Sequence, residues 1–189
     1  MRRRDAAATR AAILASARQA FVRFGYEGAG VREIARGAGV TAMLVNRYFG
    51  SKEGLFAEVV AAIMATPIIL SSKNLESKNP GETFAAALVT ITKTQALPLE
   101  GFQIMLRSAS SERAAQIGRE QIEKHYQKTL AAALTGKLAA QRAAVLLSLV
   151  AGFQVMRQMI ALPALANASP AALVKVLGPL FQQLMTSNS

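Results

Sequence analysis

Apolar residues recur every three or four positions along most of this chain, which is the spacing of amphipathic helices. Residues 9–24 follow this pattern with arginines between the apolar positions, and Gly25 is expected to end that helix. Residues 71–81 are rich in Ser, Asn and Lys, end in Pro-Gly and are predicted to form a loop. β-branched runs are rare, so the pattern predicts an all-α protein of about nine helices. Further helices are expected over residues 31–38, 42–49, 51–66, 82–96, 99–108, 111–134, 137–162 and 170–186.

Three of these helices begin at a recognisable cap. Thr41 and Ser51 each precede an apolar-periodic segment, and Ser169 is followed by a proline in the first helical position. The helix at 31–38 begins after Gly30, which offers no side-chain cap, and it contains Gly37 at a cost of about 0.5–1 kcal/mol relative to alanine.

Residues 31–49 have the features of a helix-turn-helix. Ala35 is small enough for two helices to approach, and Gly39 suits a left-handed turn. Ile34, Val40 and Val45 are expected to fill the angle between the helices. Such a unit places its second helix in the DNA major groove, although helical hairpins with no DNA role share the same pattern.

The helix at 42–49 has two distinct faces. Val45 and Phe49 are four residues apart and are expected to point inward. Ala42, Met43, Asn46 and Arg47 occupy the opposite face, and Leu44 lies between the two. The pattern therefore predicts an outward face that combines apolar and hydrogen-bonding groups.

Positive charge is concentrated at the start of the chain. The whole sequence carries a net charge of +11, and residues 1–52 hold ten Lys or Arg against three acids. This distribution favours a polyanionic partner for the first quarter of the chain, and the helix-turn-helix pattern makes double-stranded DNA the expected one. A sequence-tolerant architectural DNA-binding protein has the same charge signature and is the alternative.

The composition argues against an enzyme. The chain has no cysteine and a single histidine, His125, and its acids show no paired spacing beside a base. We therefore expect no catalytic residues, no metal and no cofactor. The longest uncharged apolar run, between Arg142 and Arg157, spans roughly 21 Å as a helix, which is too short for a bilayer. A cytoplasmic protein without a membrane partner is expected.

Three segments resemble the TetR family of bacterial transcriptional regulators. They read AILASARQAFVRFGYEGAGVREIA, AGVT and NRYFGSKEGLF. The resemblance implies a helix-turn-helix domain at 1–52 and a helical ligand-binding and dimerisation domain at 53–189, linked by the helix at 51–66. It also implies a homodimeric repressor that binds a palindromic operator and is released by a small, largely apolar effector.

The resemblance also implies which residues contact DNA. Thr41, Tyr48 and Lys52 match phosphate-binding positions, and Arg32 matches a position that reaches a base or a phosphate. The complete set is Arg32, Thr41, Ala42, Met43, Leu44, Asn46, Arg47, Tyr48 and Lys52.

Two further sets concern the second domain. Large pliable apolar residues are candidate walls of an effector cavity, although a packed core is the simpler interpretation of each: Phe84, Leu88, Phe102, Met105, Leu106, Tyr126, Phe153 and Met156. Two stripes at helical spacing fit a four-helix dimer interface, with packing inside one chain as the alternative: Ala144, Ser148, Gly152, Leu173, Leu177, Leu180 and Leu184. For a charged effector, the candidate partners are Glu100, Arg107 and His125.

Overall fold

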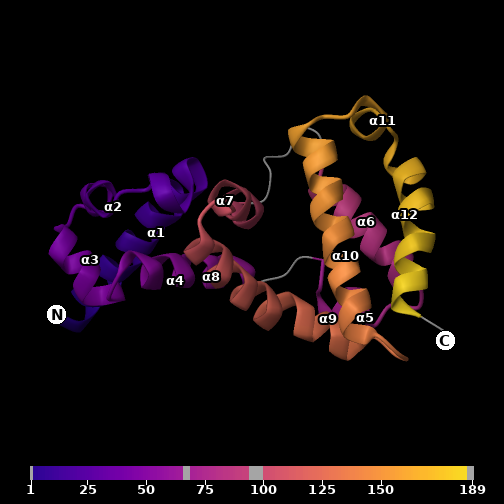
Figure 1. Ribbon diagram of the computed structural model, residues 1–189, viewed down its shortest axis with the longest axis horizontal. Coiled ribbons are helices and arrows are strands. Elements are labelled where there is room, and N and C mark those ends of the chain that lie inside the picture. Colours follow the sequence, from indigo (N-terminus) through magenta and orange to yellow (C-terminus); the bar gives the residue numbers. More distant parts are fainter. Residues whose placement is uncertain (1, 66–68, 94–99, 187–189) are drawn as a thin grey trace. The chain divides into compact units, whose positions relative to one another are not determined.

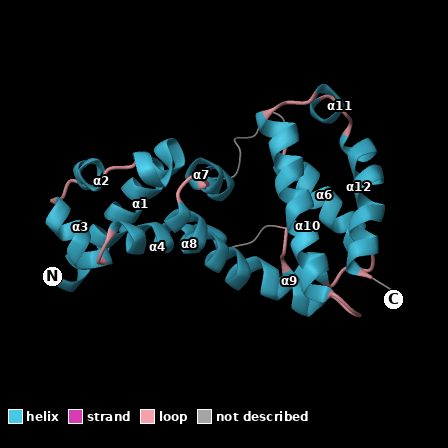
Figure 2. Cartoon of the chain, viewed as in Figure 1, coloured by secondary structure: helices cyan, strands magenta, loops and turns pink. Residues whose placement is uncertain are grey.

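The computed structural model describes residues 2–65, 69–93 and 100–186 (Figure 1). Every regular element in those ranges is helical, with no strand (Figure 2). The expectation of an all-α protein is confirmed. The chain divides into two compact units, the first comprising Met1–Thr66 and Leu99–Ile122 and the second Pro67–Pro98 and Glu123–Ser189. The functional division between residues 1–52 and 53–189 is a separate question and stays a prediction.

Among the described residues, the first unit contains the helix-turn-helix and four further helices. Its core is partly aromatic, since the rings of Phe21 and Tyr26 each meet the ring of Phe56 edge-on at 5.0 Å. Such edge-to-face contacts add to the stability that burial supplies. The elements are α1 (Arg2–Gly28), α2 (Val31–Gly37), α3 (Ala42–Phe49), α4 (Lys52–Met64), α7 (Glu100–Ser108) and α8 (Glu112–Ile122).

Helix α1 is interrupted at Gly25, where the pattern predicted that it would end. Gly25 has φ 68°, outside the helical range, and the helix resumes to Gly28. Helix α7 packs against this break: the guanidinium of Arg107 donates to the carbonyl of Arg23 at 2.8 Å. The hydroxyl of Ser108 accepts a buried hydrogen bond from the backbone N–H of Tyr26 at 2.9 Å. The end of α1 is therefore fixed by a helix some eighty residues later in the chain.

The second unit is a bundle in which α6 and α12 make the most extensive contact. They approach closely where a Cβ atom on Gly81 would meet the backbone nitrogen of Gln182 at 2.4 Å. Phe84 and Phe181 meet across this contact, with ring centroids 6.3 Å apart. The elements are α5 (Ser72–Leu75), α6 (Pro80–Ile91), η1 (Glu123–Gln127), α9 (Lys128–Ala133), α10 (Ala139–Gln154), η2 (Val155–Met159), α11 (Pro163–Ala166) and α12 (Pro170–Met185).

Several predicted boundaries differ from those observed. The segment 71–81 is not wholly a loop, because α5 forms within it. The helix expected over 111–134 has a π-helical turn, η1, between α8 and α9, and the helix expected over 137–162 ends in a second π-turn, η2. Residues 66, 94–96 and 99, expected to be helical, lie outside the described residues. Local periodicity does not distinguish α from π turns, since both keep apolar residues on one side.

By length and composition alone, one helix among the described residues is apolar enough to cross a membrane, the continuous α10–η2 helix at Ala139–Met159. It contains two arginines, Arg142 and Arg157, and both are buried in the second unit. Only 22% of its most apolar stretch is buried within this chain. On its outer side Val145 and Met156 remain exposed in the single chain.

Candidate nucleic-acid interface

Helices α2 and α3 are joined by a tight turn that only a few residues permit. Gly39 has φ 68°, in the left-handed region, and its N–H donates to the carbonyl of Arg36 at 3.1 Å. The next N–H, that of Val40, donates to the carbonyl of Ala35 at 2.9 Å. These two bonds satisfy carbonyls at the end of α2 and turn the chain toward Thr41, which begins α3.

The predicted caps are confirmed at α3, α4 and α12. The side-chain oxygens of Thr41, Ser51 and Ser169 each accept from a backbone N–H three residues later, at 3.4, 3.2 and 3.2 Å. Helix α2, by contrast, begins at Gly30 without a side-chain cap, as its sequence implies. The bonds at Thr41 and Ser51 fix where α3 and α4 begin, and with them the direction in which α3 points.

Glycine at position 37 has a packing reason that the sequence did not reveal. The hydroxyl of Ser16 on α1 donates to the carbonyl of Ile34 on α2 at 2.8 Å. A Cβ atom on Gly37 would meet that hydroxyl oxygen at 2.4 Å. The lower helix propensity of glycine is thus offset by an interhelical hydrogen bond that needs the space.

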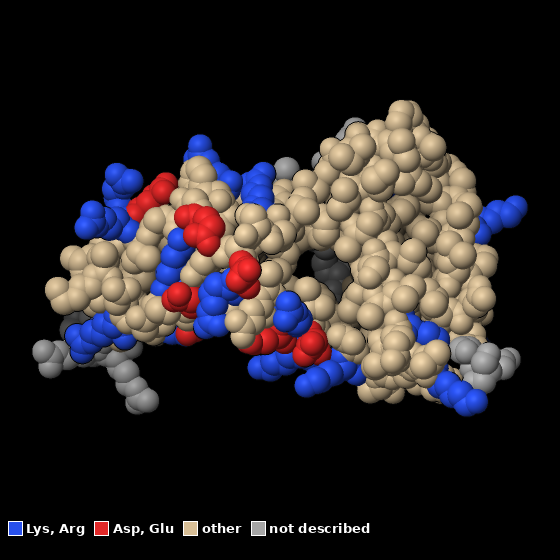
Figure 3. Space-filling model, viewed as in Figure 1, with Lys and Arg blue, Asp and Glu red and all other residues tan. Residues whose placement is uncertain are grey.

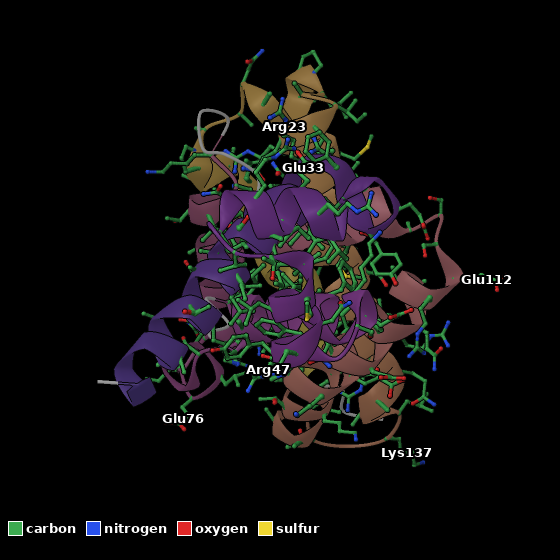
Figure 4. The ribbon with its side chains drawn as sticks, turned by 90° about the vertical axis from the view of Figure 1, so that its left-hand side faces the viewer. Arg23, Glu33, Arg47, Glu76, Glu112 and Lys137 are labelled. Atoms are coloured by element: carbon green, nitrogen blue, oxygen red, sulfur yellow. The ribbon has the colours of Figure 1, made fainter. Side chains whose placement is uncertain are left out.

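Helix α3 presents the two faces that its pattern predicts. Val45 and Phe49 are buried, together with Ile34 of α2. On the other side Met43 is 79% exposed, and Asn46 and Arg47 are exposed as well. Figure 4 views this end of the unit, with Arg47 of α3 labelled.

The remaining predicted DNA contacts lie around this exposed face. Ala42, Leu44 and Tyr48 of α3 are half-buried, and Thr41 at its start is exposed. Arg32 is exposed on α2. Eight of the nine predicted residues therefore fall within the segment 41–52, and the ninth lies on the neighbouring helix.

Lys52 is held at the start of α4 by the end of α1. Its ammonium lies 4.7 Å from the ring centroid of Tyr26 and donates to the carbonyl of Glu27 at 3.3 Å. Burial and the neighbouring Glu53 raise the pKa of Tyr26. The hydroxyl of Ser51, the backbone N–H of Glu53 and the hydroxyl of Tyr26 stabilise the ionised Glu53 carboxylate and so lower its pKa. This network places a cation beside the exposed face of α3.

Arg10 fixes α3 against the rest of the unit. It forms an ion pair with Glu58 of α4, and its guanidinium carbon lies 4.9 Å from the ring centroid of Phe49. Phe49 is the last residue of α3, so the cation–π contact joins α1 to α3 while the ion pair joins α1 to α4.

Charged side chains gather over the first unit, whereas the visible face of the second unit is almost uncharged (Figure 3). The DNA contacts predicted from the sequence left out two residues of the first unit that lie beside them. Arg36 is exposed one turn after Arg32 on the same side of α2, and this four-residue spacing could have predicted it. Tyr26 makes a cation–π contact with Lys52, which is 26 positions later in the sequence, and no local pattern predicts a contact over that separation.

The predicted effector-binding residues are divided between the two units. Phe84, Leu88 and Phe153 belong to the buried core of the second unit, with Tyr126 packed against it, and burial raises the pKa of Tyr126. Met156 of the same unit is exposed. Phe102, Met105 and Leu106 belong to the first unit. Of the charged candidates, Glu100 pairs with Arg18, and Arg107 donates to carbonyls of α1.

A groove of about 650 Å³ lies on the second unit between α6 and α12. None of the predicted effector-binding residues lines it. Its walls are Asn79, Glu82, Ala86, Val89, Thr90, Pro170, Ala171, Val174, Lys175, Gly178, Pro179 and Gln182.

The predicted dimer residues differ in their accessibility. Ala144, Ser148 and Gly152 of α10 are exposed, as is Leu180 of α12, and Leu184 is half-buried. Leu173 and Leu177 are buried in the core of their own chain, packed among α6 and α10 residues. Sequence spacing marked the apolar side of α12, but this side is also the one that α6 covers.

Two family models match the chain. Residues 13–59 match "Bacterial regulatory proteins, tetR family", and residues 79–185 match "Tetracyclin repressor-like, C-terminal domain". Together they cover both units, and the second alone covers more than half of the chain.

Solved structures share the fold at low sequence identity. A TetR-family regulator from Streptomyces coelicolor A3 is 24% identical, with a TM-score of 0.62 and 95% of each chain covered. NalD, the secondary repressor of the MexAB-OprM multidrug efflux pump in Pseudomonas aeruginosa, is 19% identical, with a TM-score of 0.63 over 98% of this chain and 100% of that one. No curated protein sequence matches the chain with significance.

Proposed function

The chain belongs to the TetR family of bacterial regulatory proteins and is a helix-turn-helix transcriptional regulator, and we propose that it is a repressor which binds a palindromic operator as a homodimer. A small, largely apolar effector releases it from the operator, and it acts in the cytoplasm. The observation that carries this proposal is the exposed face of α3, where Met43, Asn46 and Arg47 project from a helix whose other side is buried.

The residue types on that face suit base recognition. An asparagine amide pairs in a bidentate way with adenine, and an apolar side chain contacts the methyl group of thymine. Asn46 and Met43 are therefore assigned to A·T positions of the operator. Thr41, at the N-terminus of α3, is assigned to a phosphate, which the helix dipole also attracts. Tyr48 and Lys52 are assigned to phosphates, and Arg32 to a base or a phosphate.

The outer side of the second unit supports a dimer. The exposed residues of α10 and η2 carry no charge, and Val145, Gly152 and Met156 are among them. On α12, Val176 and Leu180 are exposed. A monomer rarely leaves so much apolar surface in water, so a second copy is its natural cover. In the bound dimer the two α3 helices should lie about 34–36 Å apart, or a multiple of that spacing.

The connection between the units supports release by an effector. Helix α8 of the first unit continues directly into η1 of the second. Within the first unit, α8 and α7 both contact α4, the helix that follows α3. An effector that binds preferentially to one arrangement of the second unit can thus change the spacing of the two α3 helices.

Selection of bound fragments from the genome of the source bacterium tests the proposal. A discrete palindrome, protected in footprinting, is expected from the repressor. Uniform coverage without a shared sequence would instead favour the architectural DNA-binding protein, whose affinity comes from phosphate contacts alone.

A further inference from the structure

One arginine of the second unit is buried without an acidic partner. Arg157 of η2 is 3% exposed. Its Nη1 donates to the carbonyl of Val89 at 2.8 Å and to the hydroxyl oxygen of Thr92 at 3.1 Å, while its buried Nε has no hydrogen-bond partner. The ion pairs among the described residues are Arg10–Glu58 and Arg18–Glu100, both in the first unit. The charge of Arg157 is therefore not balanced by any described acid.

A second buried arginine on the same long helix shows what a purely structural role requires. Arg142 is 9% exposed. Its Nε donates to the carbonyl of Lys137 and its Nη1 to that of Leu184, each at 3.0 Å, and its Nη2 donates to the carbonyl of Thr135. All three nitrogens of Arg142 are thus used, whereas Arg157 places both of its hydrogen bonds through Nη1. The two hydrogen bonds of Nη1 cap the end of α6, but this role does not explain why Nε of Arg157 is buried without a partner.

A further buried donor lies one turn earlier. Gln154 is 4% exposed, and its Nε2 has no hydrogen-bond partner. Gln154 is the last residue of α10 and Arg157 lies in η2, and both side chains are buried in the second unit. Both unsatisfied groups are donors, and buried donors that lack a partner are costly. An acceptor would satisfy both donors, and one that carries negative charge would suit the guanidinium best.

The side chains around Arg157 indicate that the remainder of a molecule carrying this acceptor would be apolar. The ring of Phe153 lies 5.7 Å from the guanidinium carbon, and Val89 and Leu88 are fully buried in the neighbouring core. Burial lowers the pKa of Arg157, although an arginine keeps its proton. The π-helical form of η2 is a second unusual feature here, because π-turns occur frequently at functional sites.

We propose that the effector carries a carboxylate on an apolar body, and that this carboxylate binds Nε of Arg157 and the amide Nε2 of Gln154. This inference rests on the proposed function, since it specifies the effector of the same regulator. A carboxylate fits the flat edge of a guanidinium and brings one negative charge. A phosphate brings nearly two, and every lysine whose side chain is described in this unit is exposed.

Matched pairs of acid and neutral amide test the proposal on the purified full chain, without DNA. The probes are octanoate against octanamide, and phenylacetate against phenylacetamide, with inorganic phosphate as a third arm. We expect at least one carboxylate to raise Tm with concentration while its amide and phosphate do not. Equal responses to acid and amide, a response to phosphate alone, or no response to either acid would overturn the proposal.

Two variants locate the site. Arg157→Gln should weaken carboxylate affinity about 10- to 100-fold in calorimetric titration, and Arg157→Lys should retain part of it. Arg142→Gln is the matched control, because it removes a buried arginine of the same helix and should keep the carboxylate response even with a lower Tm. Unchanged affinity in Arg157→Gln would overturn the assignment, and if that variant does not fold, the acid–amide comparison on the wild-type chain decides alone. Failure here leaves operator selection untouched, so the two proposals fail separately.

Discussion

The hydroxyl oxygen of Ser16 occupies the space into which a side chain on Gly37 would extend, since a Cβ atom there would lie 2.4 Å away. Alanine normally stabilises a helix relative to glycine by about 0.5–1 kcal/mol. Here we expect Gly37→Ala to give no such gain, because Ser16 must rotate and release its hydrogen bond to Ile34. Chemical denaturation of the purified chain measures the change.

A double-mutant cycle isolates that contact. In a Ser16→Ala background the obstructing oxygen is absent, so Gly37→Ala should stabilise by about 0.5–1 kcal/mol. If Gly37→Ala stabilised equally in both backgrounds, the two positions would not be coupled.

Base recognition by α3 is tested at Asn46 and Met43. Asn46→Ala should relax the preference for adenine at one operator position, and Met43→Ala should weaken discrimination at an A·T position by about 1 kcal/mol or more. Because Met43 is exposed, its replacement should change the free energy of unfolding by less than about 0.5 kcal/mol. Competition binding against an operator library reads both effects.

Met159→Ala is the control for Met43, since Met159 is also exposed but lies in the second unit. It should leave operator preference unchanged. Loss of specificity in the control, or retained specificity at every position in Met43→Ala, contradicts the assignment of Met43.

Phosphate binding by Lys52 predicts a change in salt dependence. Lys52→Ala should lower operator affinity and reduce the slope of log affinity against log salt by about 1, largely without altering sequence preference. Arg32→Ala should do the same if Arg32 binds a phosphate, and should relax the preference at one operator position if it contacts a base. Lys175→Ala removes an exposed lysine of the second unit and should leave the slope as it is. The assignment is wrong if the Lys52→Ala, Arg32→Ala double variant binds as tightly as the wild-type chain.

The proposed dimer surface is tested at Gly152, where an added Cβ would meet no atom of its own chain within 4 Å. Gly152→Glu should therefore leave the fold of one chain intact and place a charge at the interface. We expect sedimentation to show a monomer at micromolar concentration, together with a large loss of operator affinity. Ala132→Glu on α9, also an exposed position, should remain dimeric. A dimeric Gly152→Glu protein would mean that this face of α10 is not the interface.

The pKa of Glu53 predicts how stability at the start of α4 depends on pH. Folding lowers this pKa, so the ionised carboxylate adds stability above the usual pKa of a glutamate and loses it as pH falls through the folded value. Glu53→Gln should thus be less stable than the wild-type chain near pH 7, and the difference should shrink under acid conditions. Denaturation curves across pH 3–7 test this, with exposed Glu76→Gln as the control. A difference that does not change with pH would exclude an electrostatic contribution from Glu53.

Local sequence determined the helices of the helix-turn-helix and the start of α4. The caps at Thr41 and Ser51, the left-handed turn at Gly39 and the inward spacing of Val45 and Phe49 each involve residues only a few positions apart. Such interactions are settled within one or two helical turns, so the pattern alone predicted both faces of α3. The family motifs lie in the same stretch.

Only the tertiary structure decided which polar side chains make contacts with distant residues and which are buried without a hydrogen-bond partner. Ser16 meets Gly37, Tyr26 holds Lys52, and Arg157 reaches Val89 across 68 positions of sequence. Periodicity identifies the apolar side of a helix but not which element covers it: Leu173 and Leu177, predicted for a dimer interface, are buried in the core of their own chain. Similarly, Arg157 differs from an ordinary surface arginine only through its burial, because desolvation depends on neighbours that the chain brings together when it folds.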